Sequence, residues 1–568
     1  MAEILQTDVL IAGGGPCGLM LANELGRRGV SCLLLDPKPG TAFNPQANAT
    51  QARTMEHFRR LGFAQDIRAQ GLPADHPTDI AYFTRYVGHE LARLPLPTAA
   101  QATEKIRHLG GSWSAAELPH RISQKYVEAT LRQQAERLPG IDMRYGWALE
   151  SFDDVGTHVL AQVRAQGATA PTAVRARYLV GADGARSLVR NTLGIAWDGA
   201  SGIKREFMGG KMFAVYLRAP GFYGALPHAP AWMYVSVNAQ RRAFMASVDG
   251  QSEFAFHAAV HAGEDAEAWT ADDAQRIFNE AMGTDLPIAV LSVGTWTAGH
   301  SLVAQHFQRG RVFIGGDAAH LFTPTGGLGY NTAVEDAVNL GWKLAAVVHG
   351  AAPPQLLDSY ELERQPLAIR NTAYAQRFAD SVGMFNASPL LEHDDAAGQA
   401  ERERAADYLN RHVRLEFNIP GVTFGGRYDD SPLIVKDGST PPPDQASSYV
   451  PTASPGGRAP HAWLDDGASL YDRFNFEWTL LVLGADTPDT QAFVAGAAEL
   501  GLDLKLLTQS APPLRALYEA PLVLIRPDQI VAWRGSNADQ ARQVLAQASG
   551  HPVHQAPAVQ APDSLHLS

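Results

Sequence analysis

Cysteine is almost absent from this chain, which has only Cys17 and Cys32 among 568 residues. Two cysteines this far apart exclude a disulfide framework, a Cys-x-x-Cys redox pair and a cysteine zinc site. The sequence also lacks an apolar run of the roughly 18 residues that a membrane span needs. Its start lacks the basic residues of a signal peptide, because Glu3 and Asp8 stand there instead. We therefore expect a cytoplasmic protein with no membrane partner and no metal site.

Basic clusters are missing as well. The chain has 47 Lys and Arg residues against 59 Asp and Glu residues, a formal net charge of −12. Because a nucleic-acid binder needs a basic patch, we expect no nucleic acid as a partner. Hydrophobic residues make up 45% of the chain, as in an ordinary folded protein, and its length favours more than one domain.

A strand, a tight turn, a helix and a second strand are predicted over residues 6–36. The turn carries Gly13, Gly15 and Gly18 in the pattern Gly-x-Gly-x-x-Gly. The first glycine permits the turn, the second lets backbone amides approach a pyrophosphate, and the third lets the helix touch the strand. Asp36 ends the second strand, where a carboxylate can accept hydrogen bonds from ribose hydroxyls. The segment therefore predicts a dinucleotide site.

Antiparallel strands are favoured from about residue 205 onwards. The three segments with this character are 211–217, 232–237 and 242–248. Because side chains alternate along a strand, Tyr234 and Val235 are predicted on opposite faces of the sheet. We expect this sheet to form one wall of a substrate cavity.

The second half of the chain returns to parallel-sheet character at 311–317, followed by helices predicted at about 330–349 and 355–384. Residues 386–452 are rich in Pro, Asp, Ser and Gly and contain one charged helical piece near 396–415, so we interpret them as a connector. From residue 453 onwards, two buried strands separated by an Ala-rich helix outline a small α/β domain.

Two further motifs follow the glycine turn. Asp183-Gly184 and Arg186 come directly after a predicted strand, and Gly316-Asp317 ends the apolar segment that begins at residue 311. The loop that starts at Pro324 then leads into a helix. A flavin disulfide reductase would need a second Gly-x-Gly-x-x-Gly turn and a redox cysteine pair, and the sequence has neither.

In their order and spacing, these motifs resemble those of the class A flavoprotein aromatic hydroxylases, the family of para-hydroxybenzoate hydroxylase and phenol hydroxylase. The segment 456–461, together with 528–533, is similar to the thioredoxin-like C-terminal domain of the larger phenol hydroxylases. The resemblance implies an α/β fold, with a Rossmann-like FAD domain in residues 1–385 and an interleaved antiparallel-sheet substrate domain at about 75–115 and 195–300. A thioredoxin-like domain without redox cysteines would follow at 453–568.

The same resemblance implies that FAD is the bound dinucleotide. Asp317 would contact its ribityl chain, and Asp183 with Arg186 would lie where FAD meets NADPH or NADH. Gln124 matches a family glutamine near the flavin, whereas Gln46 stands where relatives often have an arginine for the pyrophosphate. The expected cofactor-binding residues are Gly13, Gly15, Gly18, Asp36, Gln46, Arg121, Gln124, Asp183, Arg186, Gly316, Asp317, Pro324, Gly327, Gly329, Tyr330 and Asn331.

The helix that begins at Gly329-Tyr330-Asn331 supports this loop assignment independently. Its first turn presents unpaired N–H groups and the positive end of the helix dipole. Both suit the negative charge that a reduced flavin holds near N1 and C2=O.

The base that would ionise a phenol is less evident. Some relatives have a histidine where this chain has Asn48, and an amide cannot act as a base. His76 and Tyr234 are the remaining candidates, although a turn histidine and a core tyrosine are the alternative interpretations. A phenol acidic enough to arrive ionised, such as a nitro- or chlorophenol, would need no base. By resemblance, the backbone carbonyl of Pro324 faces the substrate hydroxyl, and we interpret His320 as structural.

The implied activity is that of a flavin-dependent monooxygenase that hydroxylates a phenolic aromatic substrate through a C4a-hydroperoxyflavin, using NADPH or NADH and O₂. Two alternatives stay open. One is a flavin-dependent halogenase, although the Gly-Trp-x-Trp-x-Ile-Pro pattern of that family is absent. The other is a protein that binds FAD or a phenolic ligand without oxygenating it. A homodimer is the oligomeric state that we consider.

Overall fold

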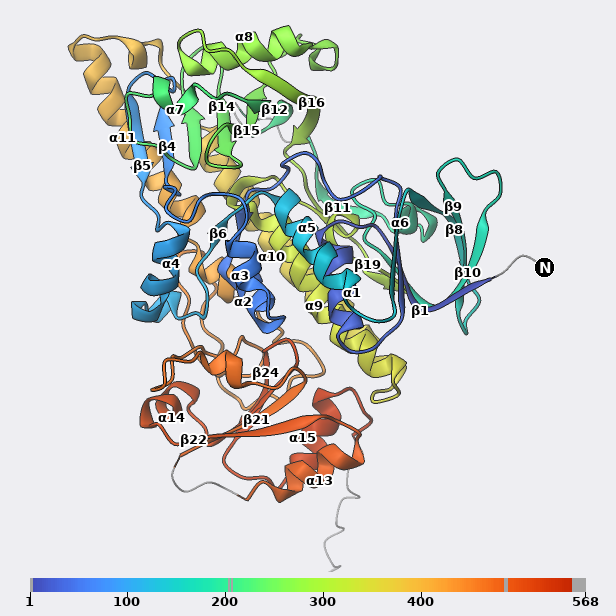
Figure 1. Cartoon of the computed structure of the whole chain (residues 1–568). Coiled ribbons are helices and arrows are strands. Elements are labelled where there is room, and N and C mark those ends of the chain that lie inside the picture. The colour runs from blue at the N-terminus through green and yellow to red at the C-terminus, as the bar shows by residue number, and fades with distance from the viewer. Residues whose placement is uncertain (1–3, 203–204, 206–207, 485–488, 554–568) are drawn as a thin grey trace, which may run out of the picture.

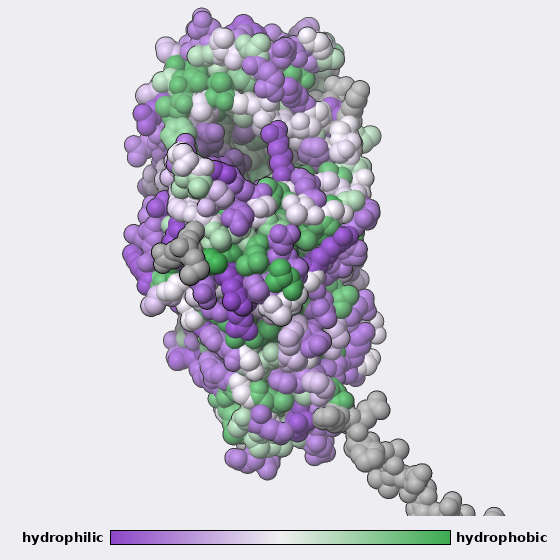
Figure 2. All heavy atoms as spheres, turned by 90° about the vertical axis from the view of Figure 1, so that its right-hand side faces the viewer, coloured by the Kyte–Doolittle hydropathy of each residue, from purple (hydrophilic) through white to green (hydrophobic). Residues whose placement is uncertain are grey.

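The structure is a computed structural model that describes residues 4–202, 205, 208–484 and 489–553. Figure 1 shows three parts stacked along the molecule: a sheet with helix α8 (Ala271–Met282) at one end, a parallel sheet with long helices in the middle, and a small sheet with α15 (Ala541–Ala548) at the other end. Hydrophilic residues cover most of the face in Figure 2, which is hollowed below the first of these sheets.

The middle part contains a parallel sheet of the dinucleotide-binding type. Its parallel strands, in spatial order, are β7 (Ile141–Tyr145), β2 (Cys32–Asp36), β1 (Leu5–Ala12), β10 (Thr172–Gly181) and β19 (Val312–Ile314). Continuous apolar runs such as Leu33–Leu35 are buried, because helices cover a parallel sheet on both faces. Helix α1 (Pro16–Gly26) follows β1 and packs against α5 (Gln124–Glu136) and α9 (Leu328–Val348).

An antiparallel hairpin extends this sheet beside β10. It consists of β8 (Trp147–Asp154) and β9 (Val159–Ala165), and β9 pairs with the first half of β10. The second half of β10 pairs with β19, so its carboxyl end stays in the parallel layer. Ligands bind at the carboxyl ends of such strands.

The sheet at the first end carries the predicted antiparallel strands, and we call it the substrate sheet because we expect it to form one wall of the substrate cavity. Its spatial order is β16 (Ala289–Ala298), β12 (Gly210–Arg218), β15 (Glu253–Ala259), β14 (Ala243–Ser247), β13 (Met233–Ser236), β4 (Ile80–Phe83) and β5 (Glu90–Leu94). The predicted strands at 211–217, 232–237 and 242–248 are thus confirmed as β12, β13 and β14. Tyr234 packs in the core under α8, whereas Val235 belongs to the core on the opposite face.

Two long helices follow α9. Helix α10 (Ser359–Gly383) packs against it, and α11 (Ala396–Phe417) packs against β5. In α11, Leu409 and Val413 are buried in one cluster with Leu91 and Trp232. The segment that the sequence suggested as a connector therefore also supplies a helix to the core behind the substrate sheet.

The C-terminal part is a small α/β domain. Its sheet has the order β22 (Leu504–Gln509), β21 (Trp478–Leu483), β23 (Leu522–Ile525) and β24 (Val531–Gly535), with helices α13 (Gln491–Glu499) and α14 (Pro512–Tyr518). The rings of Trp478 and Trp342, in α9, lie 5.8 Å apart between centroids. This domain is therefore packed on the middle part of the molecule.

Buried charged side chains also connect the C-terminal domain to the middle part of the molecule. Glu363, in α10, accepts hydrogen bonds from Arg526 at 2.6 and 2.8 Å and from Lys343 Nζ at 2.7 Å. All three side chains are fully buried.

Within the described residues, no helix combines the length and the apolar character that a bilayer crossing requires. Nor do these residues include a cluster of histidine, cysteine and carboxylate side chains that could hold a metal ion.

Candidate active site

A cavity of about 950 Å³ lies between the carboxyl ends of the parallel strands and the substrate sheet. The residues that line it come from the glycine turn, the loop after Asp183, the loop 316–330 and one face of the substrate sheet. Its walls are thus polar around the dinucleotide motifs and apolar against the sheet. This is the place where an open α/β sheet binds its ligand.

The glycine turn has the geometry that a pyrophosphate needs. Gly13 has a φ of +113°, and a Cβ there would lie 2.0 Å from the carbonyl oxygen of Ala182. A Cβ on Gly18 would lie 1.9 Å from the carbonyl oxygen of Gly13, whereas a Cβ on Gly15 would meet nothing within 4 Å. Gly13 and Gly18 therefore hold helix and strand together, and the space at Gly15 is open to a ligand beside the start of α1.

Asp36 closes one side of this turn. Its Oδ2 accepts a hydrogen bond from the N–H of Gly14 at 2.8 Å, and its Oδ1 accepts one from the N–H of Lys38 at 2.8 Å. Each carboxylate oxygen has a further lone pair. Since Asp36 also lines the cavity, it can accept from ribose hydroxyls in the way the sequence predicts.

A buried ion cluster supports the loop that carries Asp317. Asp336, in α9, accepts from the N–H of Gly316 at 3.1 Å and from Arg364 Nε at 2.8 Å, and its Oδ2 lies 2.6 Å from His320 Nε2. His320 is fully buried, which fits the structural role inferred for it. Asp317 itself lines the cavity, and desolvation raises the pKa of its carboxyl group.

The loop before α9 forms the cavity wall opposite the sheet. Pro324, Gly327, Gly329 and Tyr330 line it, and Gly327, which precedes the helix, has a φ of +62°. No side chain caps the N-terminus of α9. Its first N–H groups are therefore available to an anionic ligand group.

Asn331 is a positioning residue in the structure. Its Oδ1 accepts from the N–H of Gln51 at 2.8 Å and from Thr54 Oγ1 at 2.7 Å, and its Nδ2 donates to the carbonyl groups of Ala49 and Gly327 at 3.0 and 2.6 Å. The side chain is thus occupied within the protein and does not line the cavity. A contact of Asn331 with the cofactor therefore stays a prediction for its backbone N–H, in the first turn of α9.

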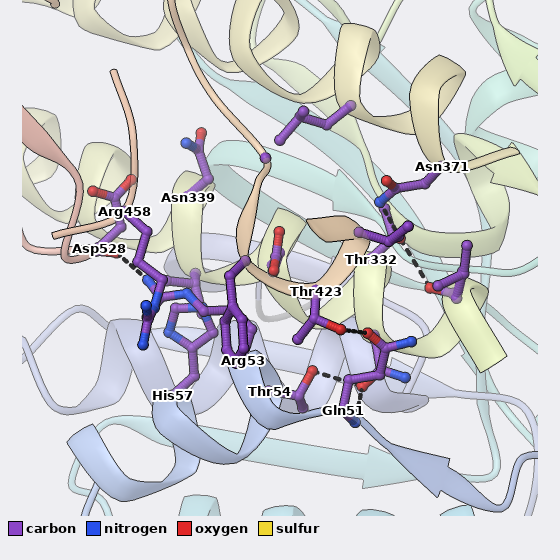
Figure 3. A pocket seen from close by; sticks show the side chains of 18 of the residues that line it. Gln51, Arg53, Thr54, His57, Thr332, Asn339, Asn371, Thr423, Arg458 and Asp528 are labelled. Atoms are coloured by element: carbon purple, nitrogen blue, oxygen red, sulfur yellow. Dashed lines mark hydrogen bonds between the residues drawn. The ribbon is translucent and has the colours of Figure 1, made fainter. Parts of the chain in front are cut away.

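Figure 3 shows the polar pocket beneath this loop, which Gln51, Thr54 and Thr423 line together. Thr423 Oγ1 donates to Gln51 Oε1 at 2.8 Å, and Gln51 Nε2 donates to the carbonyl of Gly326 at 3.0 Å. The pocket has a volume of about 50 Å³.

Several predicted cofactor residues meet in the main cavity. Gln46, Gln124 and Asp183 all line it, as does Asn48. Asp183 Oδ2 accepts from the N–H of Val189 at 3.1 Å, whereas its Oδ1 and the Oδ1 of Asn48 are buried without a hydrogen bond to any described residue. A buried acceptor without a partner is costly. Hydroxyl groups of a bound dinucleotide would be suitable donors for these two oxygens.

Arg121 and Arg186 do not line the cavity. The guanidinium of Arg121 is 4.7 Å from the ring centroid of Trp232 and 5.7 Å from that of Phe417, behind the cavity wall. Burial there lowers the pKa of Arg121 to about 10. Arg186 is exposed and follows Gly184 and Ala185, which do line the cavity.

The two base candidates face away from the cavity, which corrects their prediction as catalytic residues. Tyr234 is fully buried on the α8 side of the sheet, where its Oη accepts from the N–H of Ala231 at 2.7 Å. His76 packs edge to face against Tyr223, with 5.8 Å between ring centroids. Because side chains alternate along β13, Tyr234 lies on the face of the sheet that packs against α8 and not on the face that lines the cavity. This agrees with its alternative interpretation as a core residue.

The cavity wall on the side of the substrate sheet contains a carboxylate that the sequence did not indicate. Glu416 lies in the last turn of α11 and lines the cavity together with Tyr82, Trp232, His257 and Phe417. A glutamate in a charged helix of an apparent connector gives no sequence signal of this placement. Only the packing of α11 behind the sheet brings it to the site.

Known proteins share this architecture. The model for an FAD binding domain matches residues 6–375, and the model for an aromatic-ring hydroxylase C-terminal domain matches residues 452–552. The rebeccamycin biosynthetic enzyme RebC, in its structure with reduced flavin, is 34% identical, with a TM-score of 0.86 over 97% of this chain and 100% of that chain.

Relatives with assigned activities point the same way. Tetracenomycin B2 monooxygenase-dioxygenase of Streptomyces olivaceus is 32% identical over 95% of this chain and 97% of its own length. Phenol 2-monooxygenase of Pseudomonas sp. (strain EST1001) is 28% identical over 94% of this chain and 91% of its own. These matches do not favour a halogenase. The chain belongs to the FAD-dependent aromatic-ring hydroxylases and is an FAD-dependent aromatic monooxygenase.

Proposed function

We propose that this enzyme hydroxylates a phenol with two or more fused rings, using O₂ and NADPH or NADH. When bound, FAD carries electrons from the nicotinamide to O₂ and delivers one oxygen atom to the ring. The protein binds the ring system, orients it and excludes water. A cytoplasmic location and a homodimer stay predictions from the sequence.

The size of the substrate wall carries this proposal. Small residues on several strands line the cavity: Ala214 on β12, Ala246 on β14, Ala255 on β15 and Gly294 on β16. Their short side chains leave room for a broad, flat ring system, which the rings of Trp232, Phe244 and Phe417 can flank. The names of relatives that act on tetracenomycin B2 and aklavinone agree with an extended substrate.

A substrate with a single ring is the second candidate. It is favoured by the similarity to phenol 2-monooxygenase and to 2,4-dichlorophenol 6-monooxygenase of Delftia acidovorans. The same cavity would hold one ring loosely, and a loosely held ring lowers the fraction of reduced flavin that hydroxylates substrate.

Substrate size can be tested with phenol, 1-naphthol and 1-hydroxyanthraquinone. NAD(P)H oxidation and the mass of the product are measured for each, and the larger phenols should give more hydroxylated product per NAD(P)H consumed. Ala246→Leu should lower the activity with 1-hydroxyanthraquinone and leave the activity with phenol nearly unchanged. If phenol alone gave a high yield of hydroxylated product per NAD(P)H consumed, the enzyme would instead be a single-ring hydroxylase. NAD(P)H oxidation without any oxygenated product would favour the non-oxygenating alternative.

Arg186 is the residue that we assign to the nicotinamide cosubstrate. It is exposed and follows Gly184 and Ala185, which line the cavity. A guanidinium at this rim can pair with a phosphate of NADPH or NADH. Arg186→Ala should raise KM for the nicotinamide at least about tenfold without changing KM for the phenol. An equal change in both constants would contradict the assignment.

A further inference from the structure

Glu416 links the substrate wall to the loop that carries Pro324. Its Oε1 accepts a hydrogen bond from the N–H of Gly326 at 3.0 Å, two residues after Pro324. The side chain is 10% exposed, and the residue lines the cavity. Each of its two oxygens keeps a lone pair that can accept from a ligand. The carboxylate therefore stands where the loop beside the flavin meets the bound ring.

Two polar side chains lie behind this carboxylate. His412, one turn earlier in α11, has its Nε2 2.9 Å from Glu416 Oε2, without the geometry of a hydrogen bond. Its other ring nitrogen, Nδ1, lies 3.0 Å from the hydroxyl of Ser381. Ser381 is half-buried near the end of α10, so these side chains lead from the cavity towards the surface.

Ionisable groups surround Glu416. On its own helix it faces His412, and from the neighbouring elements it faces Arg121 and Tyr82. Arg242, the residue before β14, acts on Tyr82. The guanidinium of Arg121 lies against the rings of Trp232 and Phe417, and its positive charge attracts the carboxylate of Glu416.

The other groups with base chemistry are less suited. Asn48 cannot accept a proton, and His76 and Tyr234 face away from the cavity. His257 lines it, but its Nδ1 accepts from the indole N–H of Trp296 at 3.0 Å. The other ring nitrogen of a neutral imidazole then carries the proton, so His257 has no free lone pair for the proton of a phenol.

We propose that Glu416 is the catalytic base that accepts the phenolic proton, a step that rests on the proposed function. The phenol binds in its neutral form and donates its O–H to the carboxylate. As the ring carbon forms its bond to the delivered oxygen, the O–H bond breaks and the proton bonds to Glu416. The electron pair of that O–H bond stays on the phenolic oxygen and flows into the ring.

Glu416→Gln tests this role with little change of shape, because the amide oxygen can still accept from Gly326. The variant should bind FAD as the wild type does, and flavin absorbance should still report the binding of 1-naphthol. The rate of hydroxylation should fall about 100-fold or more, the usual contribution of a general base. The loss should be smaller for 4-nitrophenol, which is more acidic. Glu403→Gln, at an exposed position of the same helix, is the matched control and should behave like the wild type.

A second measurement uses the wild-type holoenzyme, so it does not depend on a variant that folds. The affinity for 4-nitrophenol is titrated across the pH range in which this phenol ionises. Repulsion by Glu416 should make the yellow phenolate bind more weakly than the neutral form. Tighter binding of the phenolate, or a Glu416→Gln variant that hydroxylates at the wild-type rate, would overturn the proposal. Absence of hydroxylated product from the wild-type enzyme would overturn the proposed function instead.

Discussion

The backbone N–H of Gly326 and the carboxylate of Glu416 form a hydrogen bond of 3.0 Å across 90 residues of sequence. It ties helix α11, which belongs to the core behind the substrate sheet, to the loop that precedes α9. Because Gln51 Nε2 donates to the carbonyl of the same glycine, both polar groups of the Gly326 backbone are fixed from outside the loop. The flavin side and the substrate side of the cavity are thus held in one arrangement.

The glycines of the turn should differ in their response to alanine. A Cβ at Gly18 would lie 1.9 Å from a backbone oxygen, so Gly18→Ala must separate the helix from the strand and should lower the melting temperature strongly. Gly15 has a φ of −82° and open space around it, so Gly15→Ala should fold like the wild type. Its FAD content should fall nevertheless, because the methyl group takes the place of the pyrophosphate. Full FAD content in a stable Gly15→Ala variant would contradict the position assigned to the cofactor.

Asp317→Ala should weaken FAD binding without unfolding the protein. The carboxylate is proposed to accept from ribityl hydroxyls, and a hydrogen bond to a charged group contributes roughly 1.5–3 kcal/mol. This corresponds to an increase in Kd of about 10- to 100-fold, which fluorescence titration of the apoprotein with FAD can measure. Asp430→Ala, at a fully exposed carboxylate, is the control. Equal affinities in the two variants would remove Asp317 from the cofactor site.

Tyr234→Phe should leave hydroxylation unchanged, since the tyrosine packs on the outer face of the sheet. The variant removes the acceptor of the Ala231 N–H, a buried donor that then costs about 1–3 kcal/mol. The midpoint of thermal unfolding should therefore fall while kcat stays the same. A fall in kcat of tenfold or more at unchanged stability would restore Tyr234 to the catalytic residues.

The features that the sequence predicts correctly are local in the chain. The strand, turn and helix around Gly13 are recognisable because each glycine answers a steric demand within a few residues, and the motif order then identifies the family. Strands β12, β13 and β14 follow from alternation within single segments. Alternation also separates Tyr234 from Val235, but it does not show which of the two faces meets the cavity.

The features that were missed depend on contacts between distant segments. Residues 396–415 look like a solvated helix, because nothing in their own pattern shows that β5 will pack against them. The position of Glu416 follows from that packing alone. The hydrogen bonds of the Asn331 side chain depend on distant contacts too, since its partners Gln51 and Thr54 lie 280 and 277 residues earlier in the chain.

Buried histidines should make the fold sensitive to mild acid. Burial lowers the pKa of His120 and His461 to about 3 and that of His257 to about 4. Between these values and the unfolded pKa of about 6.5, the unfolded chain binds more protons than the folded one, so stability falls as the pH drops. Each such histidine contributes about 1.4 kcal/mol per pH unit. The unfolding midpoint should fall between pH 6.5 and pH 5, less steeply in His461→Gln. An unchanged midpoint over this range would contradict these shifts.

Glu363→Gln should test the charged junction with the C-terminal domain. The substitution leaves Lys343 and Arg526 in a fully buried site with less negative charge, and breaking such a pair costs about 3–5 kcal/mol. The exposed pair of Arg542 and Glu499, at 2.7 Å, is the matched control, because Glu499→Gln should cost less than about 1 kcal/mol. Differential scanning calorimetry of both variants measures the difference.

Lys343, in the same junction, allows the effect of the lost Glu363 charge to be distinguished from a general loss of packing. Burial already lowers the pKa of Lys343 to about 8, and loss of the glutamate charge lowers it further, since that charge opposes the shift. Between the folded pKa and the unfolded value of about 10.4, the unfolded chain holds the extra proton, so stability rises with pH. Glu363→Gln should therefore regain stability from neutral pH towards pH 9, and adding Lys343→Met should restore part of it at pH 7. If neither change restores stability, the glutamate acts through its shape and hydrogen bonds rather than through its charge.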